Sequence, residues 1–241
     1  MNHKLRDLKS TRRKGMIEQY FRPGVRYLWN KPNDAIGPLN GALVPSVMVS
    51  NNLTYDGLDG HQAVIDPPLL VNVNATLGLA MRATVPHSWL DYAPGRTSHL
   101  QIGGNDILTG YMSGCLIARG THLGVMSAFH VGTIVGNAGV NQTVKQNFFA
   151  NLPADVTGFN PAGAWTHGEV AAIQASLGGG VVATPNILAL VTAGGVFYSI
   201  LMFNVSEGGQ WVNLAGQRRW CVGGKKLVQP LNRIRVRGSL L

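Results

Sequence analysis

Short apolar runs separated by turn residues fill most of this chain. From residue 42 onward, ALVPSVMVS, AVIDPPLLVNVNA and LGLAMRATV are rich in β-branched and apolar residues and are broken by Pro, Gly and Asn. Runs of this length and composition are typical of β-strands. The stretch LGVMSAFHVGTIVG predicts a further strand, or two strands with a break at Gly132.

Helical patterns are fewer. Residues 142–152 and residues 167–177 each have the length of a short helix, and three glycines at 178–180 stop the second. Two apolar runs on either side of Gly194 and Gly195 predict a hairpin. The excess of strands over helices predicts an α+β fold, with a mixed or largely antiparallel β-sandwich core and a few flanking helices.

Composition narrows the class of protein. The chain has 241 residues, 45% of them hydrophobic and 13% charged, which predicts one globular domain with a sizeable core. The only cysteines are Cys115 and Cys221, and no CxxC pair exists, so neither a disulfide scaffold nor a cysteine-type zinc site is expected. No run approaches the roughly 18 apolar residues of a membrane span. The basic N-terminus is not followed by the apolar stretch of a secretory signal peptide.

Positive charge is concentrated at the two ends. Residues 1–26 hold eight bases against two acids, and residues 216–241 hold seven bases and no acid, which leaves the middle mildly acidic. We expect a basic N-terminal arm or helix over residues 1–26 and a single catalytic domain over residues 27–241. The tail runs WVNLAG, RRWCVGG, KLVQP and RIRVRG look like edge strands, and the alternating Arg233, Arg235 and Arg237 would put one charged face outward. Basic ends of this kind could bind nucleic acid, an anionic membrane surface or an acidic partner. The alternative is that they are solvated and only keep the protein soluble.

One stretch combines a nucleophile with a base. Cys115 follows Ser113-Gly114, where a turn would aim the thiol outward and leave backbone N–H groups near the sulfur as an oxyanion hole. His130 ends the next strand-like run, and a hairpin would bring it beside Cys115. A thiol needs a neighbouring base or positive charge to attack a carbonyl carbon. The pattern therefore predicts a Cys-His site, the alternative being a buried cysteine and an ordinary strand histidine.

The same residues resemble a known group of enzymes. Ser-Gly-Cys with a histidine fifteen residues on is similar to the catalytic pattern of the cytotoxic necrotizing factor deamidases. Thr109, six residues before Cys115, resembles a threonine in the Burkholderia lethal-factor deamidase and in the chemoreceptor deamidase CheD. The match covers residues 109–130, and Met112 stands where an apolar residue such as Leu often precedes the motif.

The resemblance implies a protein glutamine deamidase that needs no cofactor or metal. Cys115 would attack the carboxamide carbon, His130 would move the proton, Thr109 would orient His130, and the turn at Ser113 and Gly114 would hold the oxyanion. It also implies a bacterial toxin or effector that reaches the host cytoplasm by a non-classical route, or else is cytoplasmic. Its expected substrate is a host protein, a GTPase or a translation factor.

Several alternatives stay open. His122, seven residues after Cys115, is a rival base whose turn position suggests exposure, and Asp106 is a rival orienting group in what reads as a turn. A protease or a transglutaminase would use the same dyad and the same thioester. A nucleic-acid-binding or structural protein would use the basic ends, although no recognised nucleic-acid-binding motif supports it.

Overall fold

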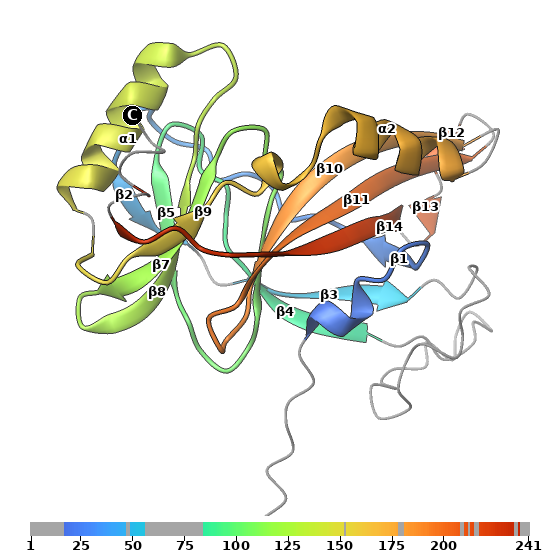
Figure 1. The fold of residues 1–241 in the computed structure, drawn as a ribbon, viewed down its shortest axis with the longest axis horizontal. Helices are drawn as coiled ribbons and strands as arrows, with labels where there is room; N and C mark the ends of the chain where they lie inside the picture. Colours follow the sequence, from blue (N-terminus) through green and yellow to red (C-terminus); the bar gives the residue numbers. More distant parts are fainter. Residues whose placement is uncertain are drawn as a thin grey trace, which may run out of the picture.

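The computed structural model of the chain describes residues 17–46, 49–55, 84–151, 153–177, 181–207, 210–211, 213–214, 217–233 and 236. Two β-sheets with two α-helices beside them make up this part of the chain (Figure 1). Most strand pairs are antiparallel, so the predicted α+β fold with a largely antiparallel core of two sheets is confirmed. No helix in the described ranges is long and apolar enough to cross a membrane.

The larger sheet closes on itself. Its strand order is β12 (Gln210–Trp211), β11 (Phe197–Glu207), β10 (Val181–Val191), β6 (Ile107–Gly110), β4 (Thr84–Trp89), β3 (Val49–Tyr55), β1 (Arg26–Trp29), β14 (Gln217–Val228) and β13 (Asn213–Leu214). β11 also pairs with β14, which completes the closure. Three buried tryptophans fill the interior edge to face, with ring centroids 5.5 Å apart for Trp29 and Trp89 and 5.3 Å apart for Trp29 and Trp220.

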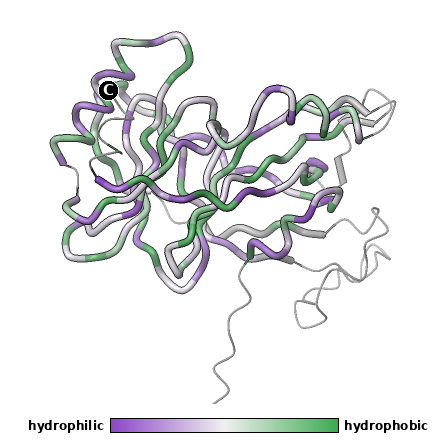
Figure 2. The backbone as a smooth tube through the Cα atoms, in the orientation of Figure 1, coloured by the Kyte–Doolittle hydropathy of each residue, from purple (hydrophilic) through white to green (hydrophobic). Residues whose placement is uncertain are grey.

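The smaller sheet packs against one side of the larger one. Its order is β2 (Leu43–Pro45), β5 (Thr97–Gln101), β8 (Val125–Val131), β7 (Leu116–His122) and β9 (Thr157–Phe159). Apolar side chains from both sheets form the layer between them, among them Ile107, Ile117 and Val191. β10 and β11 contain hydrophobic stretches (Figure 2), and they form the hairpin that the two apolar runs around Gly194 and Gly195 predict.

Each helix covers a different sheet (Figure 1). Helix α1 (Ala138–Ala150) buries Val144 and Phe148 against the outer face of the smaller sheet. It begins four residues before the predicted start at residue 142, because the Asn137 side chain accepts a hydrogen bond from the Val140 N–H and caps the helix. Helix α2 (His167–Ser176) lies over β10 and β11, where the prediction for residues 167–177 is confirmed.

The packing at the chain ends corrects two predictions, a domain boundary and an edge strand. Ile17, Tyr20 and Phe21 are buried in the closed sheet, so the boundary drawn at residue 26 falls inside the packed domain, and residues 1–16 lie outside the described part. The expected C-terminal edge strand is wrong for β14, which has β1 on one side and β11 on the other. Its bases mislead because backbone pairing does not depend on side-chain charge. Arg235 and Arg237 lie outside the described residues.

Candidate active site around Cys115

The β7–β8 hairpin places His130 and Cys115 on one face of the smaller sheet. Ile117 lies directly opposite His130, so both side chains point to the same side. Cys115 comes two residues before Ile117 and packs in the same layer between the sheets. Cys115 and His130 are therefore diagonal neighbours, whose backbones in antiparallel pairs are about 7–8 Å apart, within reach of longer side chains.

Thr109 holds His130 from the opposite sheet. Thr109 lies on β6, and its Oγ1 is 2.6 Å from Nδ1 of His130, with both side chains fully buried. In the tautomer in which Nδ1–H donates to this oxygen, Nε2 is left as a proton acceptor. Nε2 is buried and has no hydrogen-bond partner. The contact thus fixes the ring and leaves its other nitrogen unused.

Thr133 contacts the sulfur of Cys115 at two points. The Thr133 hydroxyl donates to Sγ over 3.5 Å, and Sγ lies 3.9 Å from the Thr133 carbonyl oxygen. Burial raises the pKa of the Cys115 thiol, and the hydrogen bonds from Thr133 and Gly114 only partly offset this. Cys115 is 2% exposed, so the structure shows a protected thiol at rest.

The imidazole of His130 is held neutral. Burial, aided by the nearby Lys31 ammonium, lowers the pKa of His130 to about 3. Lys31 is itself paired with Asp34 and lies 4.7 Å from the centre of the Tyr111 ring. Near pH 7 the site therefore contains a neutral thiol and a neutral imidazole.

Tyr92 links the histidine to the cysteine. Its ring packs on His130 with centroids 5.2 Å apart, and its hydroxyl donates to the Thr133 carbonyl oxygen over 2.7 Å. Burial, with a smaller contribution from Cys115, raises the pKa of Tyr92 to about 12, so the phenol stays a donor. Tyr92 and Thr133 together position the sulfur relative to the ring.

The turns beside Cys115 differ in how much space they leave. A Cβ added at Gly132 would lie 2.2 Å from the carbonyl oxygen of Ala93, so only glycine fits there and the end of β8 is fixed. At Gly114 an added Cβ would meet only the Thr133 hydroxyl, at 3.7 Å. Ser113 and Gly114 are exposed. The route from solvent to the sulfur therefore passes this turn.

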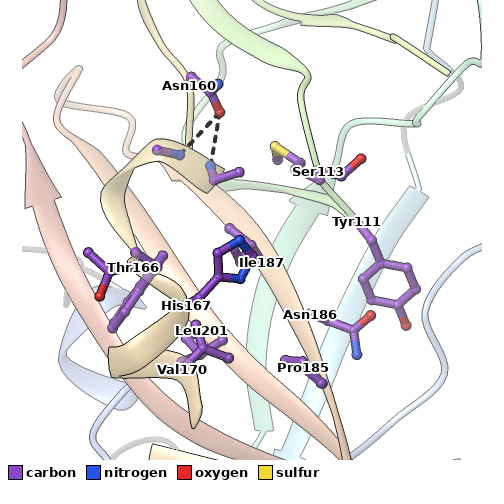
Figure 3. Close-up of a pocket in the computed structure, with 14 residues that line it drawn as sticks. Tyr111, Ser113, Asn160, Thr166, His167, Val170, Pro185, Asn186, Ile187 and Leu201 are labelled. Atoms are coloured by element: carbon purple, nitrogen blue, oxygen red, sulfur yellow. Dashed lines mark hydrogen bonds between the residues drawn. The ribbon is translucent and has the colours of Figure 1, made fainter. Parts of the chain in front are cut away.

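A cleft begins at the same turn. It has a volume of about 570 Å³ and lies between residues 111–113, the loop and helix start at 160–170, and residues 185–187 of β10. The His167 imidazole projects into it from the start of α2, with Ser113 and Tyr111 on the opposite side (Figure 3). Met112 contributes both to the cleft wall and to the core that holds Cys115, so cleft and cysteine adjoin.

The rival residues are placed elsewhere. His122 pairs with Val125 at the far end of the hairpin, about 23 Å of strand from Cys115, and its ring lies 4.6 Å from that of His99. The Asp106 carboxylate accepts N–H groups of Ile17 and Ala193 over 3.0 and 2.8 Å and so ties two loops together. Among the described residues, no three His, Cys, Asp or Glu side chains are grouped to hold a metal.

Sequence reasoning found part of this arrangement. The structure brings Thr109 into contact with His130 through the hydroxyl, and it places Cys115 on the same face of the hairpin as His130, with Ser113 and Gly114 at the turn. The sulfur hydrogen bonds to Thr133 and not to His130, whose Nε2 has no partner. The structure adds Thr133 and Tyr92, which the motif does not include. Thr133 has one sequence signal, since it follows His130 by three residues, whereas no residue pattern points to Tyr92.

Replacing Thr133 by valine should raise the pKa of Cys115 further. Valine keeps the shape but removes the hydroxyl that donates to Sγ and lowers the pKa of the thiol. Titration of the thiolate absorbance in a Cys221→Ala background, which leaves Cys115 as the sole cysteine, measures this directly. Thr133→Ser should titrate like the parent. An unchanged titration in Thr133→Val would show that the hydroxyl does not interact with the sulfur.

No protein-family model, curated protein or solved structure matches this chain. The resemblance to the deamidases therefore rests on residues 109–130 alone. What the protein does has to be inferred from the side chains around Cys115.

Proposed function

We propose that this chain is a cysteine-dependent protein glutamine deamidase, with Cys115 as nucleophile and His130 as base. The observation that carries the proposal is the 2.6 Å hydrogen bond between Oγ1 of Thr109 and Nδ1 of His130. With Nδ1–H as the donor, it leaves Nε2 as an unpartnered acceptor on the face that also carries Cys115. A nucleophile, a base and a third group that orients the base are the parts that acyl-transfer sites share.

The reaction would proceed in two halves. The thiol of Cys115 gives its proton to Nε2 of His130 as the sulfur attacks the carboxamide carbon of a substrate glutamine, which forms the C–S bond. Nε2 returns the proton to the leaving nitrogen, the C–N bond breaks, and ammonia departs. Water then loses a proton to Nε2 and attacks the thioester. The C–S bond breaks, the thiol is restored, and the products are glutamate and ammonia.

The buried, neutral pair has to be opened before it can react. Burial raises the pKa of Cys115 and lowers that of His130, so both shifts oppose proton transfer from sulfur to nitrogen at rest. In the proposal the turn at Ser113 and Gly114 moves aside to admit a carboxamide. Both pKa shifts then become smaller, because the sulfur and the ring meet polar groups. In this proposal the backbone N–H groups of the turn would bind the developing oxyanion.

The resemblance also supplies a setting for the proposal. By that resemblance the protein would be a bacterial effector or toxin whose substrate is a host protein. A protease or a transglutaminase would form the same thioester but release a peptide or take up an amine in place of water. These three reactions are therefore distinguished by their products and not by the geometry of the site.

The first test is to incubate the protein, and its Cys115→Ser variant, with a eukaryotic cell lysate and to map modified peptides by mass spectrometry. We expect one or a few glutamines to become glutamate, with release of ammonia, in the wild-type sample only. If the peptides are instead cut or cross-linked, the Cys115–His130 dyad is supported, but the reaction is proteolysis or transamidation and not deamidation. Identical maps for the two proteins would count against a catalytic role for Cys115.

A further inference from the structure

A segment without helix or strand joins the two sheets beside the site. It begins at residue 30, after β1 of the larger sheet, and ends at residue 42, before β2 of the smaller sheet (Figure 1). Residues 31–37 of this segment are called the strap below. The strap contacts Tyr111 and Tyr92, which come from the two loops that border Cys115 and His130.

The inner side of the strap lies against the residues that enclose His130. The Lys31 ammonium is 4.7 Å from the centre of the Tyr111 ring, and the Lys31 side chain is 13% exposed. The Ala35 N–H donates to the Tyr92 carbonyl oxygen over 2.8 Å, and the Tyr92 ring packs on the His130 ring. Lys31 is close enough to His130 to add to the effect of burial in lowering the pKa of this imidazole.

Few hydrogen bonds hold the strap in place. Within the described chain, residues 31–38 bond to other segments through Ala35 alone, whose N–H donates to Tyr92 and whose carbonyl oxygen accepts from the Arg96 guanidinium over 2.7 Å. Lys31 forms its ion pair within the strap, with Asp34. Backbone that makes few hydrogen bonds to its surroundings opens locally at low free-energy cost.

The outer side of the strap faces solvent. Ile36 is 98% exposed, and none of residues 31–37 is fully buried. An isoleucine at this exposure contributes almost no apolar burial that would hold the strap down. An outward movement of the strap therefore breaks the contacts of Lys31 and Ala35 but exposes no core side chain of its own.

The two reacting groups stay covered while the strap is in this position. His130 is fully buried and its Nε2 has no hydrogen-bond partner, and Cys115 is 2% exposed. A carboxamide has to come within hydrogen-bonding distance of Nε2 as well as within bonding distance of the sulfur. The turn at Ser113 and Gly114 borders the sulfur, and the strap borders the residues around the ring.

We infer that the strap is a lid, which covers His130 at rest and moves outward to give a substrate access to Cys115 and His130. The inference rests on the proposed deamidase function. The ammonium of Lys31 on the Tyr111 ring and the Ala35 hydrogen bonds are the latch. A substrate that occupies the uncovered site binds only the open form, so it shifts the equilibrium toward that form.

The test measures access to Cys115 without any enzyme substrate. It uses a Cys221→Ala background, in which Cys115 is the sole cysteine. Labelling by iodoacetamide and by the bulkier N-phenylmaleimide is followed by mass spectrometry. Both reagents attack the thiolate, so the ratio of their rates reports the space around the sulfur and cancels changes in the pKa of the thiol.

Lys31→Met is expected to raise the ratio of maleimide to iodoacetamide labelling by roughly three- to tenfold, because methionine keeps an apolar stem but loses the ammonium on the Tyr111 ring. Ala35→Pro removes the N–H that donates to Tyr92 and should change the ratio in the same direction. Thermal unfolding of each variant checks that the domain is folded.

Lys226→Met is the matched control. Lys226 also pairs with a carboxylate, that of Glu169, and its ammonium lies 4.5 Å from the centre of the Trp165 ring, but these contacts are at the start of α2 and not on the strap. This variant should keep the wild-type ratio. A rise as large as that of Lys31→Met would show a general loosening of the domain and would overturn the lid.

The remaining outcomes distinguish the lid from the proposed function. An unchanged ratio, or no labelling, in both strap variants would overturn the lid, and deamidation of a lysate protein by the wild type would still support the deamidase. If the strap variants raise the ratio but the wild type converts no glutamine in any sample, the strap is confirmed as the cover of the thiol and the deamidase function fails.

Discussion

Cys115→Ala is expected to lower the rate of glutamine deamidation by about 10⁴-fold or more, the loss seen when the nucleophile of an acyl-transfer site is removed. In the proposed mechanism the sulfur forms the covalent bond to the substrate. The Thr133 hydroxyl, which hydrogen bonds to the sulfur, would not replace it, because a hydroxyl is a weaker nucleophile than a thiol. Ammonia release with a substrate found in the lysate measures the rate. The fold should survive, because alanine is apolar and the site is a buried layer between sheets.

Cys221→Ala is the matched control. Cys221 is also 2% exposed and lies on β14 in a separate apolar cluster under α2. Both substitutions remove one buried sulfur, so both should reduce the free energy of unfolding by similar small amounts. Only Cys115→Ala should affect deamidation. Equal activities in the two variants would show that the reaction does not use Cys115.

His130→Gln is expected to lower the rate by about 10²–10⁴-fold, the usual contribution of a positioned general base. Glutamine is polar and can still hydrogen bond to Thr109, but it cannot take the proton of Cys115 at neutral pH. His122→Gln, on the same hairpin and at its far end, is the control and should keep full activity. Loss of activity in His122→Gln with retention in His130→Gln would reverse the assignment of the base.

The same variant should change how stability depends on pH. The pKa of His130 is about 3 in the folded protein against 6.5 for an unperturbed histidine, so between these values the unfolded chain binds one more proton than the folded one. The free energy of unfolding therefore rises with pH in this window and falls as pH drops from 6.5 toward 3, with a contribution of one proton at most to the slope. Urea unfolding at several pH values should give a shallower slope for His130→Gln. Equal slopes would contradict the neutral, buried state of this ring.

Local parts of the site follow from the sequence. The strand-like runs that follow Cys115 and that lead to His130 predict the β7–β8 hairpin, whose turn is at Leu123 and Gly124, and fifteen residues is a short return path from Cys115 to His130. The helix at residues 167–177 begins with a capping box formed by Thr166 and Glu169, three residues apart. These features depend on neighbours in the chain, so one sequence is enough to predict them.

Other parts depend on which distant strands become neighbours. β14 reads as an edge strand because of its bases, yet closure of the larger sheet places it between β1 and β11. The cleft joins residues 111–113 to residues 160–170 and 185–187, and Tyr92 reaches Thr133 from 41 residues away. Alternating hydrophobicity marks which side of a strand is buried, but it does not say which strand lies beside it.

The sequence by itself determined the class of fold, the two helices and the hairpin, because each is encoded by local pattern, and its short motif supplied Cys115, His130 and Thr109 as the candidate site. Tertiary structure alone decided the contact of the Thr109 hydroxyl with Nδ1, the placement of Tyr92 and Thr133, the burial that keeps thiol and imidazole neutral, and the cleft at the Ser113 turn. These arise from sheet closure and from the packing of one sheet on the other, which set distances and desolvation between residues far apart in the chain.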